Sequence, residues 1–404
     1  MKITAVETLR LGEHANLLWV RVHTDQGLVG LGETWFGAAA VEADIHERIA
    51  ALVLGEDPSR IEHLNRRMRP YAGFCGTGAE MRALSALDVA LWDIAGKAQG
   101  RAICDLLGGR TREAIAVYNT CAGPSYVSKT SAVRPENFGL NPGSASGGPA
   151  RRYEDLDAFL HRADELAASL LEMGISSMKI WPFDLAAGAA DGMDISAADL
   201  KKALAPFEKV RAAHGERMRL KAELHGLWSL TAAKKICAAL EPIGMDWVED
   251  PIFMDRLQEL PALVAATRAP LAGGETLGGL GQVQALIDTR AIATPIVDVT
   301  WGGGVSFARK CAALAEARGL PIAFHDCSGP ITLAASTHLA LAAPNVREQE
   351  IARGMYFGWY ADLVDRPPPV VKGMITVPTG PGLGLALQPG LEKRKDAVSR
   401  LTAA

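Results

Sequence analysis

Three glutamates at the ends of predicted strands are the residues most able to do chemistry together. They are Glu223 in KAELH, Glu249 in WVEDP and Glu275 in AGGET, and each follows the previous one by 26 residues. If one strand–helix unit separates them, parallel strands bring all three carboxylates to the same end of a barrel. Their charges repel one another unless a cation lies among them, and oxygen ligands favour Mg²⁺ or Mn²⁺ over zinc. One such glutamate would more simply cap a helix or face solvent, but three in register predict a metal site.

The next two predicted strands end in a carboxylate and an imidazole. Asp298 lies at the end of PIVDV and His325 at the end of PIAFH, again about one strand–helix unit apart. A carboxylate beside an imidazole fixes its tautomer and stabilises its protonated form, which makes His325 a candidate general base. The alternative is a histidine that only satisfies its hydrogen bonds at a strand end. Its position beside the predicted metal site favours catalysis.

Further polar residues are predicted at the same end of the strands. His225 follows Glu223 by two residues and is a candidate second acid or base, because a carboxylate-rich site does not need imidazole as a ligand. Lys179 ends SSMKIW, where its ammonium group either neutralises a substrate carboxylate or is merely solvated. The eighth strand offers Glu348 and Glu350, either of which could face inward. Such a set suits abstraction of a proton next to a carboxylate.

Short apolar runs that alternate with amphipathic helices must position these side chains. From about residue 114 the predicted strands are, in order, IAVYNT, SSMKIW, RMRLKAEL, MDWVED, PLAGGE, ATPIVDV, LPIAFH and NVREQE. Eight such steps over roughly 235 residues fit one closed α/β barrel of the (β/α)₇β modified TIM type, for which about 250 residues are typical. An open doubly wound sheet is the structural alternative, but no glycine-rich phosphate motif follows its first strand.

The chain before this barrel predicts a smaller α+β domain. Residues 2–10, 17–24 and 28–34 alternate like strands, and residues 81–100 form the clearest amphipathic helix. We therefore predict an α+β domain at 1–113, a barrel at 114–350 and a C-terminal segment at 351–404 that returns to the first domain. Residues 122–152 are rich in Gly, Pro, Ser and Asn, which predicts a long loop that forms a lid or a disordered connection.

The overall composition excludes several classes of function. The 42 basic and 46 acidic residues leave a net charge of −4, which provides no field for nucleic acid or an anionic membrane. No apolar run approaches the roughly 20 residues that span a bilayer, and the start lacks the pattern of a signal peptide. The six scattered cysteines are typical of reduced packing residues. We expect a cytoplasmic protein with a small-molecule substrate and neither a nucleic-acid nor a membrane partner.

Several motifs together resemble the mandelate racemase subgroup of the enolase superfamily, the mandelate racemase/muconate lactonizing enzyme family. They are ALSALDVALWDIAGKAQGRAICDLLGG, WVEDP, AGGET, VDVTWGGG, PIAFH and the final GPGLG, in the order and spacing of that family. The resemblance implies an N-terminal capping domain that the end of the chain closes. It also implies loops near residues 12–16 and 71–80 that reach over the site and select the substrate, and a homo-oligomer.

The resemblance also implies a role for each candidate residue. The three strand-end glutamates would bind Mg²⁺, which would hold the substrate carboxylate and its α-hydroxyl. His325, paired with Asp298, would remove the α-proton. Glu348, with Glu350 as the fallback, would hydrogen-bond the enediolate. The full set of implied residues is Glu223, Glu249 and Glu275 for the metal, and His325, Asp298, His225, Lys179 and Glu348 for catalysis.

One departure from the family pattern narrows the predicted reaction. Racemases of this subgroup carry two lysines around one residue on the second strand, whereas this chain has Lys179-Ile180-Trp181, so the second base is missing. A histidine two residues past the first metal ligand, here His225, is similar to galactonate dehydratases and related sugar-acid dehydratases, in which it protonates the departing β-hydroxyl. Trp181 and Trp301 either wall the pocket or pack in the core.

These patterns together predict a Mg²⁺-dependent hydro-lyase. It would convert a sugar acid, an aldonate or an aldarate, into a 2-keto-3-deoxy acid. The alternatives are a racemase or epimerase of an α-hydroxy or related carboxylate in the same family, and a non-catalytic relative.

Overall fold

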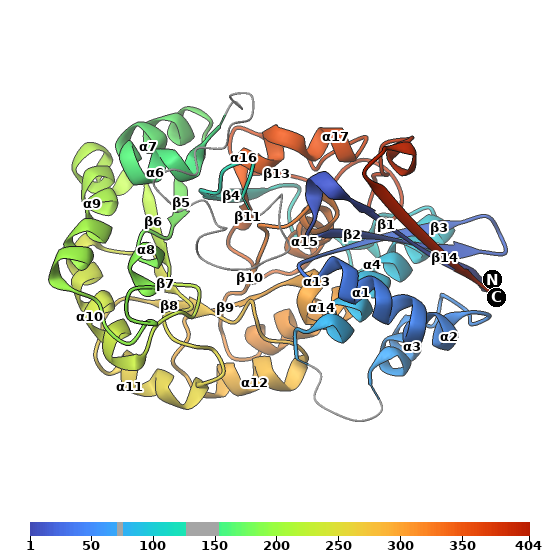
Figure 1. Ribbon diagram of the computed structural model, residues 1–404, viewed down its shortest axis with the longest axis horizontal. Coiled ribbons are helices and arrows are strands. Elements are labelled where there is room, and N and C mark those ends of the chain that lie inside the picture. Colours follow the sequence, from blue (N-terminus) through green and yellow to red (C-terminus); the bar gives the residue numbers. More distant parts are fainter. Residues whose placement is uncertain (71–75, 127–152) are drawn as a thin grey trace.

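The N-terminal part of the chain is built on a four-stranded antiparallel sheet. The computed structural model describes residues 1–70, 76–126 and 153–404. The sheet has the order β14-β1-β2-β3, with β1 at Ile3–Leu11, β2 at Leu17–Thr24, β3 at Val29–Trp35 and β14 at Ala397–Ala403. β14 comes from the far end of the chain and pairs antiparallel with β1, so the C-terminal segment completes this capping sheet (Figure 1).

One long helix attaches the capping sheet to the rest of the molecule. The helices of this region are α1 (Ala38–Asp44), α2 (Ala50–Val53), α3 (Ile61–Met68), α4 (Ala79–Gln99) and α5 (Ile103–Leu106). α4 lies against β3, where Gly32 is required because a Cβ there would collide with the carbonyl oxygen of Ala86. On its other side, Asp88 of α4 accepts a hydrogen bond from the Ser306 N–H at 2.9 Å. α4 therefore holds the capping sheet against the barrel.

Eight mainly parallel strands form the barrel. They are β4 (Ile115–Thr120), β5 (Ser177–Ile180), β6 (Arg219–Glu223), β7 (Trp247–Glu249), β8 (Leu271–Gly273), β9 (Thr294–Val297), β10 (Ala323–Phe324) and β11 (Gln349–Ile351). Strands β4 to β10 pair with their neighbours in chain order, and β11 pairs with the other side of β4. A parallel bridge between Ile322 and Val346 joins the β10 and β11 segments and closes the barrel. The predicted fold class is confirmed.

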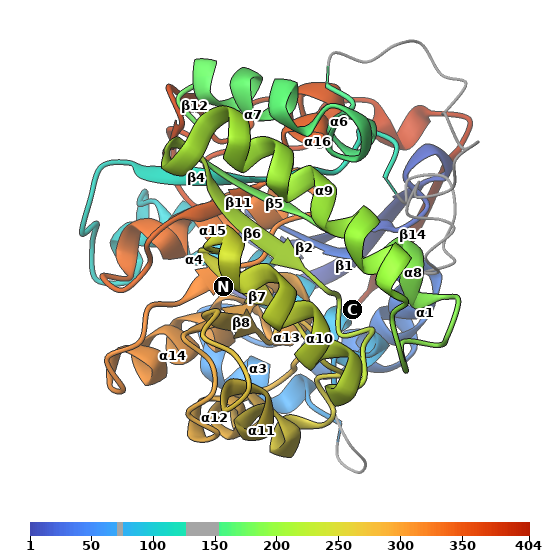
Figure 2. The ribbon, with the colours of Figure 1, turned by 90° about the vertical axis from the view of Figure 1, so that its left-hand side faces the viewer.

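Helices surround the barrel strands in Figure 2. They are α6 (Asp155–His161), α7 (Ala163–Glu172), α8 (Asp184–Ala187), α9 (Ala197–His214), α10 (Leu230–Leu240), α11 (Leu260–Val264), α12 (Leu280–Asp288), α13 (Val299–Gly302), α14 (Gly304–Glu316) and α15 (Pro330–Ala342). The C-terminal segment adds α16 (Arg353–Met355), α17 (Ala361–Leu363), β12 (Val370–Val371) and β13 (Met374–Ile375) before β14. No helix in the described part of the chain is both long and apolar enough to cross a bilayer.

The barrel interior is filled by side chains in layers, as its small diameter requires. Tyr118, Trp247 and Ile296 belong to one buried apolar cluster that comes from different strands. Lys221 is also fully buried, with its ammonium nitrogen 4.2 Å from the centre of the Trp247 ring. Residues two positions further along each strand lie about 6.6 Å higher, at the carboxyl ends. The residues predicted to do chemistry, with the exception of Glu348, lie at this end of the barrel.

Candidate metal centre and active site

The three strand-end glutamates meet at the mouth of the barrel. Glu223 and Glu249 are register partners on β6 and β7, and Glu275 follows β8. One carboxylate oxygen from each residue lies within 4.8 Å of the others, and all three side chains are buried. The 26-residue spacing produces this convergence because each interval holds one helix and one strand of the barrel.

The charge balance of this trio fits a divalent cation. Burial and the negative charge of Glu223 raise the pKa of the Glu249 carboxyl, Lys179 counteracts the rise, and the pKa is about 8 as a result. Burial also raises the pKa of Glu275, whose Oε2 is buried without a hydrogen-bond partner among the described residues. Buried carboxylates that disfavour their own ionisation, one of them with an oxygen that accepts no hydrogen bond, form an all-oxygen donor set for a hard cation.

Lys179 lies in the same cluster. Its ammonium nitrogen is 3.1 Å from Glu223 Oε2, 2.6 Å from Glu249 Oε1 and 3.0 Å from Glu350 Oε1. Burial alone would lower the pKa of Lys179, but these three carboxylates raise it well above its usual value. Lys179 therefore provides a fixed positive charge beside the acidic trio, where the sequence predicts a group that neutralises a substrate carboxylate.

His325 and Asp298, each the residue directly after its strand (β10 and β9), form a hydrogen-bonded pair. His325 Nδ1 lies 2.7 Å from Asp298 Oδ2, and His325 Nε2 is 3.5 Å from Glu275 Oε2. The other Asp298 oxygen accepts from the backbone N–H groups of Thr300 and Trp301 at the start of α13, which fixes the carboxylate. Burial acts to lower the pKa of His325, but Glu275 and Asp298 raise it well above its usual value. The pair leaves Nε2 directed toward the acidic trio.

His225 forms a second histidine–aspartate pair. Its Nδ1 lies 2.6 Å from Asp184 Oδ2, and its backbone N–H donates to Glu223 Oε1 at 2.7 Å. Although burial lowers the pKa of His225, the charges of Asp184 and Glu223 raise it to about 10. His225 has a φ of +48°, a conformation that non-glycine residues rarely adopt outside constrained sites. Sequence reasoning missed Asp184, because an aspartate in the first turn of a helix such as α8 is typical of simple capping.

The two pairs lie across the barrel mouth from each other. His225 follows β6 and His325 follows β10, which are four strands apart in a closed barrel of eight. The Trp181 ring lies 5.8 Å from the His225 ring, and the Trp301 ring lies 4.8 Å from the His325 ring. Each tryptophan therefore packs against one histidine while its own indole is buried.

The structure corrects the prediction for the eighth strand. Glu348 lies outside the cluster: its carboxylate pairs with Arg219 and, at 3.1 Å, with Lys221 in the lower layer of the barrel. Glu350 lies in the upper layer, where Oε1 contacts Lys179 and Oε2 accepts from the Asp326 N–H at 3.0 Å. Both glutamates face inward because side chains two apart share a face, but only the later one reaches the carboxyl end.

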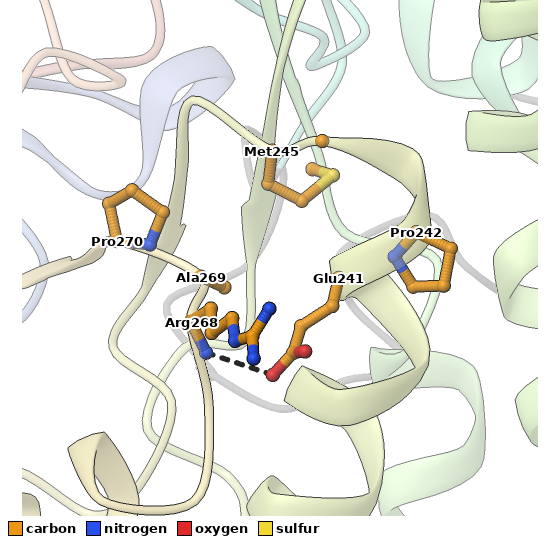
Figure 3. Close-up of a pocket in the computed structure, with 7 residues that line it drawn as sticks. Glu241, Pro242, Met245, Arg268, Ala269 and Pro270 are labelled. Carbon is orange, nitrogen blue, oxygen red and sulfur yellow. Dashed lines mark hydrogen bonds between the residues drawn. The ribbon is translucent and has the colours of Figure 1, made fainter.

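The predicted loops are only partly described. Residues 127–152, most of the predicted 122–152 loop, and residues 71–75 of the predicted 71–80 loop lie outside the described residues. Thr77, from that second loop, lines a cavity of about 370 Å³ that also borders His225. A second cavity, of about 360 Å³, lies at the turns that precede β7 and β8, and the backbone N–H of Arg268 donates there to Glu241 (Figure 3). It is lined by none of the predicted site residues.

Two models of known protein families together match most of the chain. Residues 162–391 match the family described as enolase C-terminal domain-like. Residues 3–108 match the N-terminal domain of the mandelate racemase / muconate lactonizing enzyme family. A modified barrel with an acidic trio at its mouth and a capping sheet defines an enzyme of the enolase type. The chain belongs to the enolase superfamily, in its mandelate racemase/muconate lactonizing subgroup.

Individual relatives agree with this family. The chain is 30% identical over 369 residues to a D-galactonate dehydratase from Variovorax paradoxus. This alignment covers 90% of this chain and 85% of the relative. A mandelate racemase subgroup enolase from Agrobacterium tumefaciens has 46% identity and a TM-score of 0.87, covering 100% of this chain and 99% of that one. An enolase from Sargasso Sea environmental sequencing has 41% identity and a TM-score of 0.88, with the same coverage.

Proposed function

We propose that this enzyme is a Mg²⁺-dependent dehydratase of a sugar acid, an aldonate or an aldarate. The observation that carries the proposal is the pair of histidine–aspartate contacts on opposite sides of the acidic trio, His325–Asp298 at 2.7 Å and His225–Asp184 at 2.6 Å. An elimination needs a base for the α-proton and an acid for the leaving hydroxyl, and these two pairs supply one of each. Similarity to relatives named D-galactonate dehydratase supports the same reaction.

The metal would be held by Glu223, Glu249 and Glu275. When bound there, a divalent cation supplies positive charge that stabilises the negative charge developing on the substrate carboxylate. Lys179 adds a fixed ammonium group on the other side of the same carboxylates, and Glu350 holds that ammonium group in place at 3.0 Å. These residues position the acid end of the substrate, so its C2 hydrogen faces His325.

The histidines then move the two protons. With a cation bound at Glu275, the negative charge that most raises the pKa of His325 would be offset, and the neutral imidazole would take the proton from C2 at Nε2, because its Nδ1 is occupied by Asp298. The electron pair from the C2–H bond forms the C2–C3 double bond as the C3–O bond breaks. His225 donates a proton to the departing hydroxyl, which leaves as water. The resulting enol tautomerises to the 2-keto-3-deoxy acid, so atoms and charges balance.

The test is a screen of aldonates and aldarates with Mg²⁺ in D₂O. Formation of a 2-keto acid, detected as its semicarbazone and by NMR, is the expected result for at least one acid. The His325→Asn variant should abolish it. Lack of any keto acid across hexonates, pentonates and aldarates would refute the dehydratase proposal.

The same two pairs favour one second candidate, a two-base epimerase. In that case His325 and His225 would exchange protons with the two faces of C2. The screen separates the candidates, since an epimerase incorporates deuterium at C2 with inverted configuration and forms no keto acid.

A further inference from the structure

A buried network of five polar residues joins the capping sheet to the histidine–aspartate pair at His325. Its members, in the order of their contacts, are Glu33, Thr332, Thr300, Asp298 and His325, and none is more than 5% exposed. The Thr332 hydroxyl donates to Glu33 Oε1 at 2.8 Å, and the Thr300 hydroxyl donates to Asp298 Oδ1 at 2.9 Å. The two hydroxyl oxygens lie 3.3 Å apart, and Asp298 Oδ2 lies 2.7 Å from His325 Nδ1. The network therefore runs from β3 to the residue that follows β10.

Glu33 is fixed at the capping end of this network. Trp19 Nε1, on the neighbouring strand β2, donates to Glu33 Oε2 at 2.8 Å, and the Thr332 backbone N–H donates to Oε1 at 2.9 Å. Because Thr332 lies in the first turn of α15, a carboxyl from the capping domain caps a helix of the barrel. A Cβ at Gly329 would lie only 2.4 Å from Glu33 Oε1, so glycine leaves the room that this carboxyl occupies.

The next residue of β3 makes a second contact with the barrel. The Thr34 hydroxyl donates to the Thr300 carbonyl oxygen at 2.9 Å. Thr300 belongs to α13, the short helix whose first N–H groups hold Asp298, and His325 lies just before the segment that leads into α15. Two consecutive residues of one capping strand therefore hold the segment after Asp298 and the helix after His325. Since the pair comes from two different strands, β3 helps to set the position of one partner relative to the other.

The number of protons in the network decides how its members are bonded. Each threonine hydroxyl has one proton to donate, and the Thr300 proton is used on Asp298. With Glu33 ionised, the Thr332 proton is used on Glu33, and none remains between the two threonines. With Glu33 protonated, its proton binds the Thr332 oxygen and the Thr332 proton binds Thr300. Burial raises the pKa of Glu33 to about 7, although hydrogen bonds from Thr332 and Trp19 oppose the rise, so the form that completes the network is populated near neutral pH.

We propose that Glu33 of the capping domain is a positioning residue for the base, acting on Asp298 through the hydroxyl groups of Thr332 and Thr300. The inference rests on the proposed function, because it takes His325 as the group that removes the C2 proton. Each hydrogen bond of a buried network polarises the next, and the last of them orients the Asp298 carboxylate that holds the imidazole. Glu33 therefore affects proton transfer rather than substrate binding, which the proposed metal site provides.

Replacement of Thr332 by valine interrupts the network with little change of shape. It removes the hydroxyl and keeps the backbone N–H that donates to Glu33. For the acid that the screen identifies, kcat should fall by about 3- to 10-fold with KM nearly unchanged, as expected for one lost neutral hydrogen bond. Deuterium exchange at C2 should fall in parallel, and Thr332→Ser should restore most of both rates. Thr337→Val is the matched control and should keep the native kcat, because Thr337 is equally buried on α15 but donates to the Leu333 carbonyl oxygen at 2.7 Å.

Glu33→Asp tests the first residue of the network. It shortens the side chain by one methylene group, which withdraws the carboxyl from Thr332 and keeps its chemistry. We expect kcat to fall as it does in Thr332→Val. The Glu33→Asp/Thr332→Val double variant should lose no more kcat than the more impaired single variant, because one break already interrupts the network. Losses that multiply in the double variant would overturn the inference.

A readout without turnover separates this inference from the proposed function. ¹H–¹⁵N NMR of the Mg²⁺-loaded enzyme, labelled at histidine, reports the Nδ1–H of His325 that donates to Asp298, and loss of the signal in His325→Asn assigns it. Thr332→Val and Glu33→Asp should shift this signal, and Thr337→Val should not. A shift in an enzyme that forms no keto acid would refute the dehydratase and keep the coupling of Glu33 to the pair. An unshifted signal, a change in KM alone, or an equal loss of kcat in Thr337→Val would overturn the inference while the dehydratase stands.

Discussion

Replacement of Asp184 by asparagine tests the role of the second histidine–aspartate pair. The structure places Asp184 Oδ2 at 2.6 Å from His225 Nδ1, with the Asp184 side chain almost fully buried. Asparagine keeps the shape of the side chain but removes the charge that stabilises a protonated His225. One charge-assisted hydrogen bond contributes about 1.5–3 kcal/mol. If the Asp184 hydrogen bond stabilises His225 only in the step in which the hydroxyl leaves, its loss should lower kcat for dehydration by about 10- to 100-fold.

The assay measures two steps in the same sample. Dehydration is followed as 2-keto acid, and removal of the C2 proton is followed as deuterium incorporation from D₂O. Because His325 and Asp298 are untouched in Asp184→Asn, proton exchange should persist while dehydration falls. Asp199→Asn is a suitable control, since Asp199 is half-buried in the first turn of α9 and its side chain accepts a hydrogen bond from Ser196 rather than from a predicted site residue. Unchanged dehydration, or an equal loss of exchange and dehydration, would refute the reasoning that Asp184 acts through His225 as the acid.

Three further predictions concern the metal, the barrel layers and pH. Glu249→Gln should weaken Mg²⁺ binding by about 10-fold or more in calorimetry, and unaltered affinity would remove it from the ligand set. Glu350→Gln should lower kcat by about 10-fold or more, whereas Glu348→Gln should lower Tm with kcat within a few-fold of the native value; the reverse pattern would contradict the layer assignment. Burial lowers the pKa of His338 from 6.5 to about 4, so its stabilisation is complete above pH 6.5 and is lost as the pH falls towards 4. Between pH 7 and pH 5 this titration removes about 2 kcal/mol of unfolding free energy from the native enzyme. The Tm of His338→Gln should therefore fall less than that of the native enzyme over this range; parallel Tm curves would argue against it.

The barrel and its metal trio could be predicted from local patterns. Each predicted strand is a short apolar run, and each is followed by a helix whose length fits one barrel step. Regular alternation fixes both the direction of the strands and the end at which their last residues lie. For that reason Glu223, Glu249 and Glu275 were placed together correctly from their spacing alone. Asp298 and His325 followed from the same rule.

The sequence could not decide whether Glu348 or Glu350 lies at the active site. The answer depends on how close each residue is to the carboxyl end of the barrel. Glu348 and Glu350 have the same parity, so an inward-facing pattern fits both residues equally. The starting point of β11 at Gln349 and its pairing with β4 decide which glutamate reaches the upper layer. Glu348 instead forms ion pairs with Arg219 and Lys221, and no local sequence motif predicts these ion pairs.

The sequence by itself determined the family pattern, the barrel and the identity of the acidic trio, because those features repeat at fixed intervals along one chain. Only the tertiary structure decided that Asp184 reaches His225 across 41 residues, and that the capping domain contributes Thr77 to a cavity at the barrel mouth. Such contacts join elements whose separation in sequence carries no periodic signal. They arise from the closure of the barrel and from the packing of α4 and the capping sheet against it.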